Sequence, residues 1–571
     1  MKKYNILFLL CALLFTACSE DKLDIAQKGV IDIKNFYITD ADAQSALVST
    51  YADFAQNIGG NDGIYVPYNV MFNYPADNVL AAGAFYTDND GQACLNEFRH
   101  TTQTPMISTM YKRFYWVIYH CNLVINNFKY GVSPIKDRCI SEARVMRAWC
   151  QMMLAMGWNN PPLVETVLGG SDKPANYEKG HDAMLQWCAD ECADAVKYLD
   201  SRASTTDKDG AVKVTKGFAW TVQGKALLYK GDYAGAKTAL ANVISSGKYA
   251  LVPGNRWASL FHIAGDGCEE KIFETNLINN SSIGDWGGKI NRSTWMESNY
   301  WGWRTDRLAS KPLCQDDAGW GGLAVEENFA KQFAANDGAS YRRIGTMVSY
   351  DEFLYDSSVG WTTDTVGMTP AMKTVDKKRG IVDNNGLYGN NLYLQKKNIV
   401  GPGDRTTNWY RFNNFNIERY ADVLLMYAEA CANTSDAAVG SLPAGSGLKA
   451  LNDVQKRAGV PATSISQTLT LADVKKERNY ELWNEGARWI DMKRWNEFDK
   501  AKTAGEHIPT LRDHFFDSDA TTKTATHVGY VTYSEPNAAI SHGFKAGKYE
   551  WFPYPFSETS INPNIKQNPG W

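Results

Sequence analysis

The sequence predicts a mainly α-helical protein. Helical hairpins of the tetratricopeptide type are expected to form a scaffold, and a long loop-rich region with short strands is expected to carry the binding surface. Three observations support this prediction. Apolar residues recur at three- and four-residue spacing over much of the chain, which is typical of amphipathic helices. One segment has the residue spacing of a tetratricopeptide repeat. Residues 254–410 lack this periodicity and are rich in Gly, Asn, Asp and Trp.

The periodic segments fall into two groups, four in the first half of the chain and three near its end, separated by stretches with Gly, Pro or Asn. Each is long enough for several helical turns. The predicted helices span residues 41–56, 107–128, 140–156, 181–199, 417–431, 448–457 and 471–496. Within the loop-rich part, residues 271–275 are predicted to form a short strand.

The tetratricopeptide match rests on small residues at positions where two helices approach closely. Gly and Ala allow close helix packing because they lack a bulky side chain. The sequence therefore predicts a helical hairpin here, with the number of repeats left open. The matching residues are Trp220, Gly224, Gly231, Tyr233, Ala236 and Leu240.

The N-terminus has the pattern of an export signal. Lys2 and Lys3 precede ten apolar residues, a run too short to span a bilayer and typical of a signal peptide. The run ends in Thr16-Ala17-Cys18, which is similar to the lipobox of bacterial lipoproteins. We therefore expect residues 1–17 to be a signal peptide, Cys18 to be lipidated and residues 18–35 to form a tether. An ordinary secretory signal is the alternative.

The composition favours stacking interactions over proton chemistry. The chain has 18 Trp, 30 Tyr and 23 Phe but only eight His, so we expect no metal site and no cofactor. With 59 basic and 63 acidic residues the net charge is −4, which excludes an electrostatic nucleic-acid binder. Cys188 and Cys192 are predicted to be buried thiols.

The C-terminal third contains recognisable motifs. Residues 419–430 read RYADVLLMYAEA, and the tail 561–571 reads INPNIKQNPGW. Together with the lipobox and the tetratricopeptide match, they closely resemble the SusD/RagB family of outer-membrane nutrient-binding lipoproteins, over essentially the whole chain. The resemblance implies a SusD-like fold in which residues 36–571 are one domain. Its parts would be a helical repeat part (36–253), a loop-rich binding part (254–410) and C-terminal helices with the tail (411–571).

Charged residues of the C-terminal helices recur three or four positions apart, which is the spacing of ion pairs along one helix face. We predict that they are ion-paired framework groups and not a catalytic cluster, as the resemblance also implies. They are Arg419, Asp422, Glu429, Glu477, Arg478, Glu481, Glu485, Arg488, Asp491 and Arg494.

Two patches are candidates for ligand binding. Five of the 18 tryptophans fall within residues 286–320, in a Gly- and Asn-rich context where rings on loops could stack on the C–H faces of sugars. The alternative is that these rings attach the loops to the scaffold. The family resemblance implies a second patch in the loop at residues 77–86, whose residues could equally serve as turns. The candidates are Trp286, Trp295, Tyr300, Trp301 and Trp303 in the first patch, and Asp77, Asn78 and Tyr86 in the second.

The resemblance implies a cell-surface lipoprotein that captures an oligosaccharide and delivers it to a SusC-like TonB-dependent outer-membrane transporter. It would be held in the outer membrane by lipid alone, facing the cell exterior, and would not be an enzyme. Two alternatives remain open. One is a peptide-binding receptor of the same fold. The other is a surface glycoside hydrolase, which would need a carboxylate pair. The candidates for that pair are Asp285, Glu297, Asp306, Asp316 and Asp317.

Overall fold

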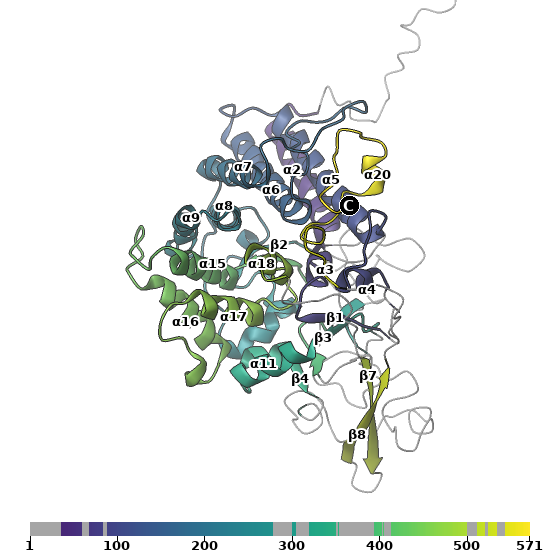
Figure 1. The fold of residues 1–571 in the computed structure, drawn as a ribbon. Coiled ribbons are helices and arrows are strands. Elements are labelled where there is room, and N and C mark those ends of the chain that lie inside the picture. The colour runs from purple at the N-terminus through teal and green to yellow at the C-terminus, as the bar shows by residue number, and fades with distance from the viewer. Residues whose placement is uncertain are drawn as a thin grey trace, which may run out of the picture.

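The computed structural model describes most of the chain. The described residues are 36–59, 68–83, 88, 90–277, 300–303, 319–349, 352, 393–401, 404, 413–498, 511–519, 524–533 and 543–571. Figure 1 shows helices in the upper and left parts of the molecule, short strands in the lower part, and one long hairpin that projects at the bottom. The predicted fold class, mainly α with helical hairpins and short strands, is confirmed.

The first helices pack against one another in the order of the chain. Ser133 caps the third of them by accepting a hydrogen bond from the Lys136 amide. Two of these helices start with Pro, which fits the first helical turn because that position needs no N–H donor. The four helices predicted in this half are confirmed, with ends shifted by a few residues. They are α2 (Asp40–Gly59), α5 (Pro105–Asn127), α6 (Pro134–Trp158) and α7 (His181–Ala195).

The predicted tetratricopeptide-type hairpin is formed by α8 (Lys216–Lys230) and α9 (Tyr233–Ser245). Gly231 ends α8 with a positive φ of 88°, a conformation that favours glycine. Gly224 lies where the helices meet: a Cβ atom added there would lie 2.6 Å from the Leu240 Cγ. Gly224 therefore permits the close approach of the two helices.

The C-terminal helices begin with α15 (Tyr420–Asn433), which packs on α9, and α16 (Ser446–Ala458). The prediction of one helix over 471–496 is wrong. The chain forms α17 (Leu471–Glu481) and α18 (Arg488–Arg494), because Asn484 and Gly486 between them have φ values of 60° and 82° that an α-helix does not allow.

Among the described residues, the strands pair in twos, always antiparallel, and three of these four pairs join segments that are far apart in sequence. The strand predicted at 271–275 is confirmed as β2. The pairs are β1 (Val79–Ala81) with β3 (Leu323–Val325), β2 (Lys271–Glu274) with β6 (Asn416–Arg419), β4 (Met347–Ser349) with β5 (Tyr393–Gln395), and β7 (Leu511–Asp519) with β8 (Thr524–Tyr533).

Short helices connect these elements. The loop-rich part predicted from the sequence contains one helix of three turns, α11, so its described portion is more regular than expected. The short α-helices are α3 (Tyr68–Asn73), α4 (Asp90–Asn96), α11 (Glu327–Asp337), α12 (Tyr341–Thr346) and α20 (Phe556–Thr559). The 3-10 helices are η3 (Val196–Tyr198), η4 (Asp209–Ala211), η5 (Gly254–Phe261), η6 (Ile263–Gly265) and η9 (Ala462–Ser464).

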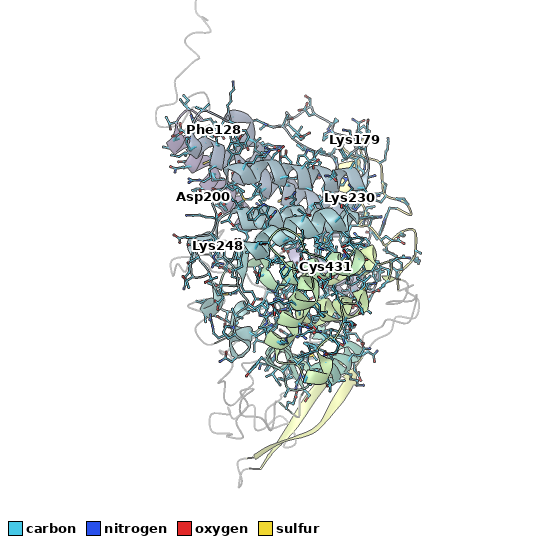
Figure 2. All side chains as sticks on the ribbon, turned by 90° about the vertical axis from the view of Figure 1, so that its left-hand side faces the viewer. Phe128, Lys179, Asp200, Lys230, Lys248 and Cys431 are labelled. Atoms are coloured by element: carbon cyan, nitrogen blue, oxygen red, sulfur yellow. The ribbon has the colours of Figure 1, made fainter. Side chains whose placement is uncertain are left out.

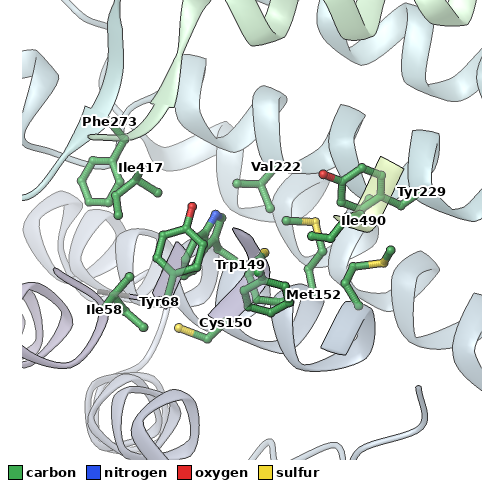
Figure 3. Packing of buried hydrophobic residues seen from close by; sticks show 14 of the residues in the cluster. Ile58, Tyr68, Trp149, Cys150, Met152, Val222, Tyr229, Phe273, Ile417 and Ile490 are labelled. Carbon is green, nitrogen blue, oxygen red and sulfur yellow. The ribbon is translucent and has the colours of Figure 1, made fainter. Parts of the chain in front are cut away.

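One continuous apolar core runs from α2 to the C-terminal tail. Figure 3 shows its centre, where Tyr68 meets Trp149 edge to face at 5.1 Å between ring centroids and Phe273 and Ile417 lie close by. The tail closes this core. The Trp158 indole donates to the Pro553 carbonyl (2.9 Å), and both elements belong to the same cluster.

Cys188 and Cys192 are buried, as predicted, and burial raises the pKa of both thiols. No helix in the described part of the chain is both long and apolar enough to cross a bilayer.

Candidate functional site

The charged residues of the C-terminal motifs form a buried ion-pair network. Arg419 contacts Glu270 (2.9 Å), Glu481 (2.6 Å) and Glu485 (2.6 Å), and it lies in β6 at the centre of the network. Burial alone would raise the pKa of Glu481, but the guanidinium groups around it outweigh this effect and hold it well below its usual range.

A second part of this network surrounds Arg478, which contacts Asp422 (2.7 Å) and Asp491 (2.8 Å). Arg494 pairs with Glu429 on α15. The prediction that these charges are paired framework groups is confirmed. The predicted pairing along single helices is wrong for most of them, because their partners lie on other elements: the acids and bases join α15, α17, α18 and β6 to one another.

The strand pair β1–β3 brings the two predicted patches together. Residues 319–322 lead into β3 and lie along residues 300–303: the Gly322 amide donates to the Tyr300 carbonyl (2.8 Å), and the Gly321 amide to the Gly302 carbonyl (2.7 Å). From the other patch, the Ala82 amide donates to the Gly322 carbonyl (3.1 Å), which also accepts from the hydroxyl of Tyr74, three residues before that patch (2.8 Å). Segments more than 200 residues apart thus form one surface.

Asp77 and Asn78 are engaged in bonds within the protein. Arg488 donates from two nitrogens to the two oxygens of Asp77, at 2.7 Å each. Asn78 is buried, and its side-chain amide donates to Asn479 (2.8 Å). The backbone carbonyl of Asn78 accepts a hydrogen bond from the Trp483 indole (3.0 Å). These contacts fix the loop that leads into β1.

Trp301 and Trp303 lie inside this region. Both indoles are buried, with 0% and 3% of their surface exposed. The Trp303 indole donates to the Gln395 carbonyl (2.8 Å), and the Gln395 amide donates to the Trp301 carbonyl (2.9 Å). The Trp303 ring and the Trp301 backbone therefore attach residues 300–303 to β5.

Tyr300 and Trp320 are partly exposed aromatic residues at this surface. Their rings meet edge to face at 5.4 Å. Burial raises the pKa of Tyr300; a hydrogen bond with Gln92 opposes this shift and the nearby charge of Asp88 adds to it. The phenol is therefore neutral near pH 7 and can donate a hydrogen bond.

Sequence reasoning placed Trp320 in the tryptophan-rich region but did not single it out as a site residue. Gln92 was missed altogether, because an isolated Gln on a short helix gives no signal in a sequence. Several candidates lie outside the described residues: Trp286, Trp295, Tyr86, Cys18, and the carboxylates Asp285, Glu297, Asp306, Asp316 and Asp317.

The sequence of this chain matches the model of one known protein family. The model described as "SusD family" matches residues 269–571, more than half of the chain. The chain belongs to the SusD family. Over its full length it is 24% identical to a SusD-like protein of Bacteroides ovatus, of which 98% is covered. It is 21% identical to the SusD-like protein P38 of Formosa agariphila, with 87% of this chain and 92% of that protein covered.

Solved structures of SusD-like proteins share the fold. A laminarin-binding SusD-like protein superimposes with a TM-score of 0.68 at 21% identity, covering 93% of this chain and 99% of the other. The surface glycan-binding protein A of Bacteroides thetaiotaomicron, solved with laminarihexaose, gives a TM-score of 0.67 at 19% identity, covering 93% of this chain and all of that protein.

Membership confirms the predicted family. It also confirms the prediction that this SusD-family protein is not an enzyme, because the family consists of surface binding proteins.

Proposed function

We propose that this SusD-family protein binds an oligosaccharide at the surface that carries Tyr300 and Trp320. The observation that carries the proposal is this pair of partly exposed rings, held by backbone hydrogen bonds next to β3, where both predicted patches meet. Two solved SusD-like neighbours, one named for laminarin and one in complex with laminarihexaose, support a glycan as the ligand class.

The chemistry of the surface fits a sugar. A pyranose ring has an apolar C–H face that stacks on an aromatic ring, and a rim of hydroxyl groups that needs donors and acceptors. The Trp320 ring would supply the stacking face. The Tyr300 hydroxyl and the Asp88 carboxylate would serve the hydroxyl groups, with the buried Gln92 beside Tyr300.

The remaining candidates take two roles in this proposal. Trp301, Trp303, Asp77 and Asn78 would hold the surface in place through their buried contacts. Trp286, Trp295 and Tyr86 stay proposed ligand contacts on the sequence argument alone.

Binding is tested with the chain from Ser19 onward, which keeps every described residue. Laminarin, starch, xylan and mannan are tested for retardation in native gels, and laminarihexaose by calorimetry. We expect single-chain affinities in the micromolar to millimolar range, because each stacked ring contributes only ~0.5–1.5 kcal/mol beyond area burial. Trp320→Ala should weaken binding about tenfold, and Tyr300→Phe about fivefold through loss of one hydrogen bond.

The matched control is Tyr341→Ala, which removes a ring that is 55% exposed on α12. It should bind as the unchanged chain does. Retention of none of the four polysaccharides, or unchanged affinity of both site variants, would contradict the proposal. Release of reducing sugar from a bound glycan would favour the hydrolase alternative, and binding of peptides alone the peptide receptor.

We further propose that lipid on Cys18 anchors the protein in the outer membrane, facing outward, and that it delivers glycan to a SusC-like TonB-dependent transporter. Tyr37, near the start of the described chain, packs on Phe128 at 5.6 Å between ring centroids. Figure 2 shows Phe128 at the end of the molecule opposite the β7–β8 hairpin. The tether would therefore join the body at that end.

Two measurements test the anchor and the partner. Cys18→Ala should move the protein from the membrane fraction to the soluble fraction; persistent membrane retention would contradict lipid anchoring. A C-terminal tag should co-purify a barrel protein in mild detergent from cells grown on the inducing glycan. Recovery of the lipoprotein alone would count against delivery to a transporter.

A further inference from the structure

An aromatic stripe runs along one face of α5, from the buried Tyr111 to the exposed Tyr119. Tyr111, Tyr115 and Tyr119 are four residues apart and so lie on one helix face, with Trp116 beside them. Trp116 is 54% exposed and Tyr119 38% exposed, although a helix usually turns polar residues towards water. Their rings lie 6.0 Å apart at only 31° to each other. They form a shallow shelf.

This shelf borders a groove of about 560 Å³. Its floor is formed by Tyr111 and Tyr115. One wall is the loop at 162–174, with Val164 and Leu168, and the other is the tail after α20, with Ile561 and Ile565. The volume lies in the range of small-molecule sites, roughly 300–1,000 Å³.

Hydrogen bonds hold both walls in place. The Tyr115 hydroxyl donates to the Pro162 carbonyl (2.7 Å), and the Asn122 amide to the Val164 carbonyl (3.0 Å). The tail is fixed by Asn562, whose side chain donates to the Pro174 carbonyl (2.8 Å), and by Asn564, which donates to the Lys173 carbonyl (2.7 Å). The groove is therefore formed before any ligand arrives, which lowers the entropy cost of binding.

Polar groups occur at two levels of the groove. On the floor, Tyr111 is 2% exposed, and its hydroxyl lies beside the Tyr115 hydroxyl. At the rim, Lys112, Asp172 and Lys173 are exposed, and Glu558 is partly exposed. The rim thus offers both donors and acceptors around an apolar interior.

We propose that this groove is a second oligosaccharide site, in which pyranose rings stack on Trp116 and Tyr119 and sugar hydroxyls bond the polar groups of the rim. A wholly apolar ligand would cover the polar groups of the rim without bonding them, at an energetic cost. A sugar stacks its C–H face on the rings and meets the rim with its hydroxyls. The inference rests on the proposed function, since it assigns the same ligand class to a different surface.

The two sites lie on different parts of the molecule. Figure 1 shows α5 and α20 in its upper half and β1 with β3 in its lower half. A polysaccharide long enough to reach both would gain avidity, because binding at one site raises the effective concentration at the other. A short oligosaccharide would gain no avidity, because it cannot reach both sites. The second site should therefore matter most for long chains.

The test uses the chain from Ser19 onward and whichever of laminarin, starch, xylan and mannan it retains. We expect the double variant Trp116→Ala/Tyr119→Ala to bind that polysaccharide at least about fivefold more weakly. Amide hydrogen exchange should show that the polysaccharide protects residues 159–174 and 556–571 in the unchanged chain and not in the double variant. Tyr198→Ala, which removes a ring that is 45% exposed outside the groove, is the matched control and should bind normally.

Three other outcomes would each contradict a second glycan site in the groove. Retention of a polysaccharide with unchanged affinity in the double variant and no protection of the groove walls overturns this inference alone. Retention of none of the four overturns the proposed function and this inference together. If removal of residues 19–35 increases exchange in the groove walls without any glycan, the groove is assigned to the chain's own N-terminal segment instead.

Discussion

Glu142 is a buried carboxyl group whose surroundings only partly compensate for its burial. The Tyr51 hydroxyl donates to it (2.5 Å), and the Arg138 guanidinium lies 3.4 Å away. Burial raises its pKa to about 7, with Tyr51, Arg138 and Lys213 lowering it and Asp200 raising it. The folded protein therefore keeps a proton on this group over a pH range in which the unfolded chain has lost it.

This proton makes stability fall as pH rises. Between the unfolded pKa of 4.5 and the folded pKa of about 7, the folded state binds more protons, so the contribution of Glu142 is full below pH 4.5 and is lost by about pH 7. Glu142→Gln cannot ionise. We expect its free energy of unfolding, relative to the unchanged chain, to rise by on the order of 3 kcal/mol between pH 4 and pH 8. Urea titrations at both pH values measure this.

Glu178→Gln, at an exposed position, is the control and should show no such change. A constant difference between Glu142→Gln and the unchanged chain across this pH range would show that Glu142 titrates as an ordinary carboxyl.

Among the elements, the α8–α9 hairpin depends most clearly on one missing side chain. Leu240 on α9 is fully buried, and its Cγ and Cδ2 occupy the space beside Gly224. A methyl group at this position would have to displace a packed leucine. Overpacking of this kind costs ~1–3 kcal/mol, which outweighs the ~1 kcal/mol that Ala gains over Gly in a helix.

We therefore expect Gly224→Ala to lower the free energy of unfolding by about 1 kcal/mol or more. The control is Gly91→Ala in α4, where an added Cβ meets nothing within 4 Å. That change should be neutral or stabilise by up to ~1 kcal/mol. Thermal melts followed by circular dichroism compare the two, and an equal effect of both changes would refute the packing argument.

The helices could be predicted from the sequence because their periodicity is local. The break at Asn484 and Gly486 was not predicted: both are helix-breaking residue types, but charged and apolar residues continue through it at helical spacing, and the positive φ values show that the helix ends here. The ion-pair partners could not be predicted either: helix spacing suggested basic partners on the same helix for Glu481 and Glu485, whereas both contact Arg419 on β6.

The candidate site was predicted in part. The high frequency of tryptophan in residues 286–320 indicated the region. Frequency alone, however, cannot distinguish a ring that faces water from one that anchors a loop. Trp303 bonds a backbone carbonyl in the interior, whereas Trp320, not singled out, is partly exposed. Asp77 looks like a ligand contact in sequence until its partner Arg488, which is 411 residues away, is known.

For the whole molecule, the C-terminal tail acts as a clasp on the first helices. Asn568 is buried, and its side-chain amide donates to the carbonyls of Trp158 (3.1 Å) and Phe552 (2.9 Å). Asn564 makes a similar bond to Lys173 at an exposed position. The same residue type thus closes the fold once inside the protein and once at its surface.

We expect Asn568→Ala to lower the free energy of unfolding by ~1–3 kcal/mol, because the buried Phe552 carbonyl loses this donor, whereas the Trp158 carbonyl still accepts from the Tyr554 hydroxyl. Asn564→Ala should cost less than ~1 kcal/mol, because water replaces the lost bond. Urea unfolding followed by tryptophan fluorescence and by circular dichroism measures both. Equal costs for the two changes would mean that the buried bonds do not close the fold.

The clasp has a consequence for the order of events during synthesis. A ribosome completes α2 to α9 hundreds of residues before it reaches Asn568, so the early helices exist for a time with their apolar faces uncovered. Contacts between such distant residues form slowly, and uncovered apolar surface promotes aggregation. The nascent chain is therefore a natural client for a chaperone until its last residues are free, and a chain cut short near its end would remain one.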